Sequence, residues 1–172
     1  MKLMEKVLYH YTSTYHLPAI LRTEYLKLTE SNLKAPTQEE MVNLLKYGGY
    51  DSTSLYKPCV WLTTSNKTEC HGLEGSAVDK TEIKITVRWQ KDFQNWKVWS
   101  RANGINKKWA KALEKGRNSN SWWISEKPIL FADIIQIENT KTKEIYFTNE
   151  GNCENDTIPQ NFLYKPMVNI AV

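Results

Sequence analysis

The stretch LYHYTS at residues 8–13 combines an imidazole, two phenols and two hydroxyls in consecutive positions. On a strand, His10 and Thr12 share one face, while Tyr9 and Tyr11 share the other. Because an imidazole and a threonine Oγ both donate and accept hydrogen bonds, this pair could hold the edge of a ribose or an amide. A strand histidine that hydrogen-bonds only within the core is the alternative.

The stretch VWLTTS at residues 60–65 ends in three consecutive hydroxyl residues, Thr63, Thr64 and Ser65. Trp61 could stack a flat heterocycle, while these hydroxyls bond a ribose or hold a carboxylate in place. A buried strand followed by a polar turn explains the same pattern without a ligand.

The stretch SWWISEKPI at residues 121–129 places Glu126 after an aromatic-rich segment and just before Pro128, which restricts the chain beyond it. A carboxylate beside bulky aromatic rings can have a shifted pKa and a defined rotamer, and both suit a catalytic acid or base. A solvated loop glutamate paired with Lys127 or another cation is the alternative.

The elements that must position these residues follow from apolar periodicity. Between Thr81 and Trp89, for example, apolar and polar residues alternate as they do in a half-buried strand. The sequence predicts strands over residues 7–12, 59–63, 81–89, 121–125, 130–138 and 144–148. It predicts helices over residues 15–25, 36–47, 93–102 and 106–116.

Helices and strands mix here without strict alternation, and no glycine-rich phosphate loop occurs in the sequence. We therefore expect an α+β fold in one domain, with a mostly antiparallel sheet split around a cleft, rather than a doubly wound parallel sheet. The domain would span residues 1–172, with a core over about 7–148 and a tail over 149–172 that wraps the surface.

The charge and cysteine content limit the classes of protein. With 23 Lys and Arg against 19 Asp and Glu in 172 residues, the net charge is +4, which permits a polyanionic ligand but does not by itself indicate one. Three cysteines cannot form a closed disulfide framework, and no Cys or His pairs have zinc-site spacing, so we expect no metal site. Without a long apolar run or a signal-peptide pattern, we expect a cytoplasmic protein with no membrane partner.

Taken in order, the three stretches resemble the motifs of the ADP-ribosyltransferase superfamily, from about Leu8 to Ile137. The chain looks most similar to the compact bacterial and phage members whose first motif reads His-Tyr-Thr. It resembles the DarT-type and RNA 2′-phosphotransferase branches more distantly. The resemblance implies an ADP-ribosyltransferase-like split-sheet fold that takes NAD as its substrate and needs no metal.

The resemblance also implies roles for the residues of the first two stretches. His10 would bond the ribose and nicotinamide side of NAD, with Thr12 assisting. Trp61 falls on the aromatic position of the second motif, and either Trp61 or Tyr11 could stack the nicotinamide. The hydroxyl positions of that motif, which would also bind NAD, fall on Thr63, Thr64 and Ser65.

The catalytic acid implied by the resemblance is Glu126, with His10 as its partner in catalysis. Some branches place the acid before the late strand, where this chain has residues 118–120, Asn-Ser-Asn. Cleavage of the N-glycosidic bond of NAD passes through an oxocarbenium-like centre, as in glycoside hydrolysis, and a nearby carboxylate stabilises its positive charge. Nicotinamide would leave, and ADP-ribose would pass to a macromolecular acceptor.

The acceptor stays open at the level of the sequence. Residues 106–117 carry four lysines and Arg117 around Trp109. This pattern suits phosphate contact and base stacking, but the sequence favours the simpler explanation, a solvated helix face with Trp109 turned inward, and Glu114 dilutes the charge. Protein, DNA and RNA acceptors are all consistent with the sequence.

Two other functions compete with this one. RNA 2′-phosphotransfer would need several Arg or His phosphate ligands, and the four arginines of the chain lie in no recognisable motif. A non-catalytic binding module of the same fold could instead sequester a nucleotide, a nucleic acid or a partner protein. Release of nicotinamide from NAD distinguishes an enzyme from such a module.

Overall fold

The central strand of the structure shows the predicted alternation directly. The computed structural model describes residues 6–29, 58–73 and 77–149. Within β4 (Ile83–Arg88), the side chains of Ile83, Ile85 and Val87 are fully buried, whereas the intervening residues are partly exposed. β4 pairs antiparallel with β1 (Val7–Thr12) on one side and with β8 (Ile134–Asn139) on the other. β4 therefore lies in the middle of the sheet, with one face buried in the core.

Seven of the described strands form one sheet in the order β5-β6-β3-β1-β4-β8-β9, and every neighbouring pair is antiparallel. The other strands of this sheet are β3 (Val60–Thr63), β5 (Gln94–Asn95), β6 (Trp122–Ser125) and β9 (Ile145–Thr148). β2 (Tyr25–Leu26) and β7 (Ile129–Leu130) form a separate two-stranded sheet. The described α-helices are α1 (Leu17–Thr23), α4 (Trp96–Ala102) and α5 (Lys107–Glu114). The prediction of a single α+β domain with a mostly antiparallel sheet is confirmed.

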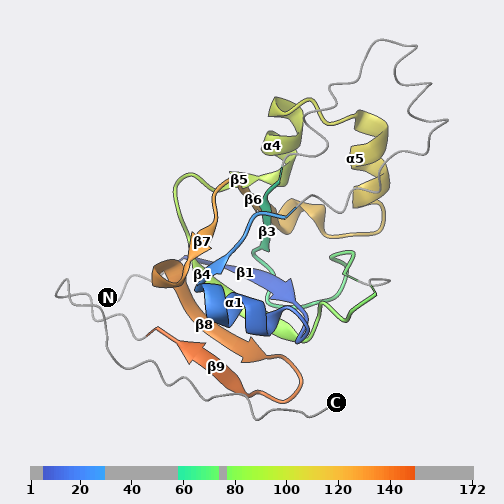
Figure 1. Cartoon of the computed structure of the whole chain (residues 1–172). Coiled ribbons are helices and arrows are strands. Elements are labelled where there is room, and N and C mark those ends of the chain that lie inside the picture. Colours follow the sequence, from blue (N-terminus) through green and yellow to red (C-terminus); the bar gives the residue numbers. More distant parts are fainter. Residues whose placement is uncertain (1–5, 30–57, 74–76, 150–172) are drawn as a thin grey trace, which may run out of the picture.

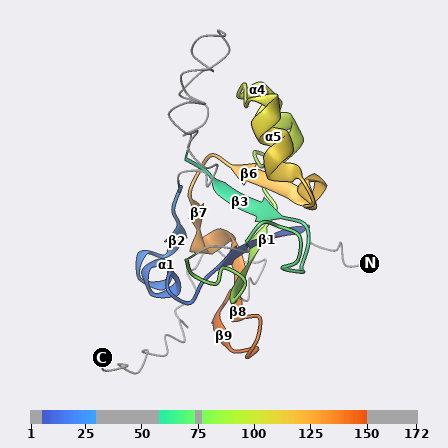
Figure 2. The ribbon, with the colours of Figure 1, turned by 90° about the vertical axis from the view of Figure 1, so that its right-hand side faces the viewer.

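The helices lie at two separate places on the sheet (Figures 1 and 2). α1 lies beside β1 and β8, whereas α4 and α5 lie together at the other end of the molecule, beyond β6. No helix in the part of the chain that the structure describes is long and apolar enough to cross a membrane.

Several predicted elements are shorter or more divided than their periodicity indicated. α1 ends at Thr23, because Glu24 adopts a left-handed conformation with φ 59° and its N–H closes on the Ile20 carbonyl. The predicted strand over residues 130–138 is interrupted by a 3-10 turn at Phe131–Asp133. Its first part pairs with β2 and its second part with β4, so one apolar run serves two sheets.

The predicted helix over residues 93–102 begins only at Trp96, because the Asn95 side chain accepts a hydrogen bond from the Lys97 N–H and caps it. Asn106 caps α5 in the same way through the Lys108 N–H. A 3-10 turn at Ser119–Ser121 precedes β6. The predicted helix over 36–47 and all but the first residue of the predicted tail lie outside the described residues.

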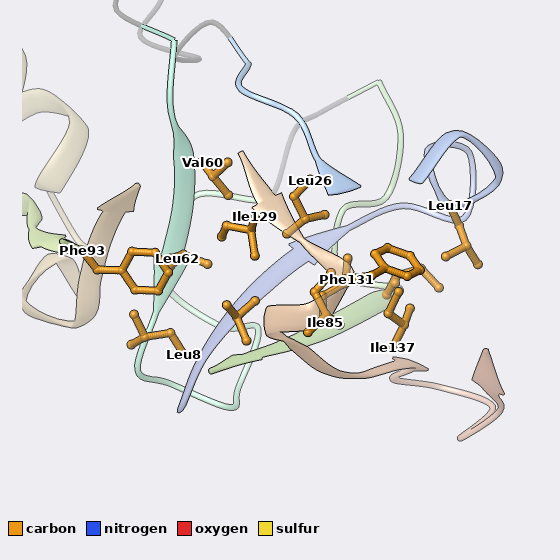
Figure 3. Close-up of a cluster of buried hydrophobic side chains, with 13 residues drawn as sticks. Leu8, Leu17, Leu26, Val60, Leu62, Ile85, Phe93, Ile129, Phe131 and Ile137 are labelled. Carbon is orange, nitrogen blue, oxygen red and sulfur yellow. The ribbon is translucent and has the colours of Figure 1, made fainter. Parts of the chain in front are cut away.

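Two apolar clusters cover opposite faces of the sheet at β3 and β6. Val60 and Leu62 belong to the first cluster, whereas Cys59 belongs to the second and Trp61 packs against it. Because side chains alternate along a strand, the two clusters lie on opposite faces. Figure 3 shows the first cluster, in which side chains from α1, β2 and β7 meet those of the sheet. The second cluster contains Trp96, Trp99, Ile105, Trp122 and Ile124.

The sheet is nearly interrupted between β1 and β3. β1 pairs with β4 along its whole length, but it shares only the Tyr9–Thr63 pair with β3. The halves β5-β6-β3 and β1-β4-β8-β9 therefore meet along a short junction. We call this junction, formed by residues 9–13 and 61–65, the seam.

We expect Ile85→Ala to lower the free energy of unfolding by about 2–5 kcal/mol, because it removes most of a fully buried side chain from the central strand. Chemical denaturation monitored by tryptophan fluorescence measures this loss. Val98→Ala is the control, because Val98 is 61% exposed on α4 and its truncation should change stability by no more than about 0.5 kcal/mol. Equal effects of the two substitutions would contradict the assigned core.

Candidate functional site

His10 spans the seam through its ring. Its Nδ1 lies 2.8 Å from the backbone carbonyl oxygen of Trp61. A carbonyl oxygen only accepts hydrogen bonds, so Nδ1 carries the proton in this contact and Nε2 is left with a lone pair. No described residue hydrogen-bonds to Nε2. The geometry therefore presents one fixed hydrogen-bond acceptor at the seam.

The charge of His10 is set chiefly by burial. Desolvation lowers the pKa of the imidazole below 6.5, the hydrogen bond to Trp61 partly opposes that effect, and nearby Lys80 adds to it. His10 is therefore neutral at pH 7. A neutral imidazole with its proton on Nδ1 accepts a hydrogen bond from a hydroxyl at Nε2, which an imidazolium cannot do.

Two further hydroxyls lie at the same end of β1. Thr12 and Ser13 are both buried, and Ser13 is only 1% exposed. The Oγ of Ser13 has no hydrogen-bond partner among the described residues. Buried polar atoms are almost always paired, so this hydroxyl is an exception within the described part of the chain, but it is covered by protein and offers no surface to a ligand.

Tyr11 holds the chain that follows β3 against β1. Its hydroxyl donates a hydrogen bond to the Ser65 carbonyl at 3.2 Å, and its ring stacks on His71 with centroids 6.5 Å apart and planes 18° apart. Burial raises the pKa of Tyr11, so the phenol stays protonated. Because the residue is only 7% exposed, its ring already has its neighbours within the protein.

The hydroxyl residues of the second motif divide into two kinds. Thr63 is buried, and its Oγ1 donates to Ser121 Oγ at 2.9 Å while accepting from the Ser65 N–H. Ser121 Oγ in turn donates to the Asn118 carbonyl. Thr64 is exposed and Ser65 is partly exposed. Thr63 therefore belongs to an internal hydrogen-bond chain, while Thr64 and Ser65 lie at the surface of the seam.

The Trp61 ring packs into the second cluster. It lies 4.9 Å from the Trp96 ring and 5.8 Å from the Trp122 ring, measured between centroids. Its backbone carbonyl, rather than its ring, is the part that contacts His10.

Glu126 lies directly after β6, on the side of the second cluster. Its Oε1 accepts a hydrogen bond of 2.7 Å from Nε1 of Trp99, which is fully buried. The pairing with Lys127 considered above is not present, because Lys127 forms its ion pair with Asp92 at 2.9 Å. The glutamate is thus held by an indole in an aromatic environment.

The structure does not place Glu126 beside His10. On β1, His10 shares a face with Leu8 and pairs with Ile85, and both of those side chains belong to the first cluster. Glu126 bonds Trp99, which belongs to the second cluster on the opposite face. The two residues predicted to share catalysis therefore lie on different faces of the sheet.

Sequence reasoning missed two groups at the seam. His71 stacks on Tyr11 and accepts a hydrogen bond from Trp122 Nε1. The partly buried Lys84–Glu138 ion pair, with Lys84 also 5.6 Å from the Tyr9 ring, lies on the face opposite His10. The alternation within residues 81–89 could have placed Lys84 on the polar face of its strand. Its ion pair with Glu138 could not be predicted, because it depends on the pairing of β4 with β8.

The side chains that could contact a ribose-bearing ligand are His10, Thr64 and Ser65. For metals, the described part of the chain contains no group of three or more His, Cys, Asp or Glu side chains that could hold an ion. Cys59 and Cys70 are free thiols, the first buried and the second exposed.

Comparison of the chain with models of protein families found no match. Searches of curated proteins and of solved structures found no matching protein or structure either.

We expect the free energy of unfolding to decrease as the pH falls below 6.5, because the unfolded chain then protonates His10 more readily than the folded protein does. His10→Gln should remove this part of the pH dependence. An NMR titration measures the pKa of the ring, and ¹⁵N chemical shifts report its tautomer. A ring pKa at or above 6.5, or a proton on Nε2, would contradict the assignment.

Proposed function

We propose that this protein is an NAD-dependent ADP-ribosyltransferase that binds NAD at the seam. The observation that supports this proposal best is the His10 ring, which the Trp61 carbonyl holds across the seam with Nε2 as a neutral acceptor. A ribose offers hydroxyl donors that match such an acceptor. The His-Tyr-Thr motif that resembles the superfamily is the segment that carries this ring.

In this proposal the end of β1 forms the binding edge. His10 Nε2 accepts a hydrogen bond from a ribose hydroxyl. Thr64 and Ser65, at the surface of the seam, supply further hydroxyls. Thr12 and Thr63 are buried beneath these residues and support them.

The two aromatic residues of the motifs act as supports for the site. Tyr11 fixes the segment after β3 through its bond to Ser65, and Trp61 fixes His10 through its carbonyl. Both rings are packed within the protein, so they hold the seam in shape for the ligand. Preorganisation of this kind reduces the entropy that binding must overcome.

The reaction breaks the bond between the ribose C1′ and the nicotinamide nitrogen, and nicotinamide leaves with the electron pair. A nucleophilic atom of the acceptor forms the new bond to C1′ and loses its proton. A carboxylate stabilises the positive charge that develops at C1′. The motif resemblance gives this role to Glu126, and because Glu126 bonds Trp99 on the face opposite the neighbours of His10, the Glu126→Gln experiment below decides whether it acts on NAD.

A non-catalytic binding module is the second candidate, and one observation favours it. Glu126 bonds a buried tryptophan on the face opposite the apolar neighbours of His10. If Glu126 only supports Trp99, the seam would bind a nucleotide without cleaving it. The experiments below separate these two functions.

We expect His10→Ala to weaken NAD binding about 2- to 12-fold, because it removes a neutral hydrogen bond worth roughly 0.5–1.5 kcal/mol. Isothermal titration calorimetry measures the affinity. His16→Ala is the matched control, because His16 is exposed at the start of α1 and should leave NAD binding unchanged. A folded His10→Ala variant with wild-type affinity would make His10 a purely structural residue.

We expect Glu126→Gln to lower nicotinamide release from NAD roughly 100- to 1000-fold, because it removes a charge that stabilises the transition state. NAD affinity should change far less, since the ground-state ribose carries little of that charge. Chromatographic measurement of nicotinamide provides the rate, with protein, DNA and RNA offered as acceptors.

Glu114→Gln is the control for this experiment. Glu114 Oε1 also accepts a hydrogen bond from a buried indole, Trp96 Nε1, at 2.6 Å. If both glutamine variants keep wild-type turnover, Glu126 is a structural partner of Trp99. If the wild-type protein binds NAD but releases no nicotinamide with any acceptor, the binding module replaces the enzyme.

A further inference from the structure

The positive charge of the chain is concentrated in one segment. Residues 97–117 contain seven Lys and Arg and a single acid, Glu114, which gives this segment a net charge of +6 within a chain of net charge +4. The rest of the chain therefore has a net charge of −2. The one acid is already paired, because Glu114 Oε2 lies 2.5 Å from Lys97 Nζ.

Of the remaining cations of this segment, Arg101 lies on α4, and the other five are exposed on and around α5. Lys107, Lys111 and Lys115 follow one another at intervals of four residues, so they lie along one side of the helix, with Lys108 nearby. None of these lysines forms an ion pair with an acid of the described residues. We call these four lysines and Arg117 the basic face.

The opposite side of α5 attaches the helix to the domain. Ala110 and Leu113 pack against the second cluster. Trp109 is only partly buried and is not part of that cluster or of the residues packed against it. Consecutive residues of a helix lie about 100° apart, so Trp109 stands at the border between Lys108 and the side that Leu113 attaches to the domain.

Arg117 connects the basic face to the seam. Its Nη1 donates a hydrogen bond to the Leu113 carbonyl, and its guanidinium lies against the backbone of Gly72. Gly72 has φ +72°, and a Cβ at this position would lie 2.7 Å from Arg117 Cζ, so only glycine allows this approach. The next residue towards the seam is His71, which stacks on Tyr11.

We propose that the basic face binds the phosphate backbone of a single-stranded nucleic acid and directs it towards the seam. Five cations without acidic partners in the described part of the chain complement a polyanion with regularly spaced charges. The partly buried Trp109 ring favours a single strand, because unpaired bases can stack on an aromatic side chain. This inference deepens the proposed function, since it names the class of acceptor and rests on that function for the transfer step.

The test measures binding without NAD, so its result is independent of the transferase reaction. Fluorescence anisotropy follows the binding of labelled single-stranded DNA and RNA oligonucleotides of mixed sequence over a range of salt concentrations. The variant Lys107→Gln/Lys111→Gln/Lys115→Gln removes three charges from the basic face. The matched control, Arg22→Gln/Lys27→Gln/Lys91→Gln, removes three exposed charges elsewhere.

We expect the basic-face variant to bind either oligonucleotide on the order of tenfold more weakly at about 0.1 M salt. The slope of log K against log salt should become shallower by about 2, since each lost phosphate contact contributes about 0.7 for a single strand. The control variant should keep the wild-type slope. Circular dichroism establishes that both variants fold and melt as the wild type does.

Four outcomes would overturn the proposal. In the first, the wild type does not bind oligonucleotides at low salt, and in the second, the basic-face variant and the control variant lose equal affinity. In the third, duplex DNA binds as tightly as a single strand, and in the fourth, polyglutamate binds as tightly as an oligonucleotide. The last result would indicate an acidic protein partner. If the wild-type protein binds oligonucleotides but releases no nicotinamide from NAD, the proposed function is contradicted, while the basic face remains a nucleic-acid binding surface.

Discussion

The hydrogen bond from His10 Nδ1 to the Trp61 carbonyl joins two halves of a sheet that otherwise share a single residue pair. β1 pairs with β4, and β3 with β6, along the whole strand, so the seam between β1 and β3 is where side chains replace the missing ladder bonds. On the other face, the hydrogen bond from the Tyr11 hydroxyl to the Ser65 carbonyl also joins the two halves. Each bond that closes the seam also fixes the orientation of a side chain, and the proposed NAD site relies on this coupling.

The tryptophan-rich second cluster explains how the half of the sheet beyond the seam is stabilised. Trp96 and Trp99 are fully buried, and the Nε1 of each donates to a glutamate, Glu114 or Glu126. A buried indole needs such an acceptor, because an unpaired N–H in an apolar environment is costly. The carboxylate with the strongest catalytic claim therefore also has a structural task.

The positive charges of the basic face lie on the same side of the seam as the second cluster. The cations gather on α5, beyond the aromatic cluster, and Arg117 and Gly72 connect that helix with the seam. A ligand that bound at the seam and a polyanion on α5 would approach the same junction from different elements. The proposed transfer reaction needs such an arrangement, because donor and acceptor must meet at one carbon atom.

The sequence alone determined the strand at residues 7–12, the alternating strand around Ile85 and the α+β class, because period-two burial is a local property that tertiary contacts rarely reverse. It also singled out His10. It did not determine that residues 130–138 divide between two sheets, or that Glu126 lies on the other face from the neighbours of His10. Those facts depend on which strands pair and which face of the sheet each helix covers. Pairing between strands that are far apart in the chain leaves no periodic pattern in the sequence of either strand. The tautomer of His10 likewise depends on a carbonyl 51 residues away, which only the folded chain brings to it.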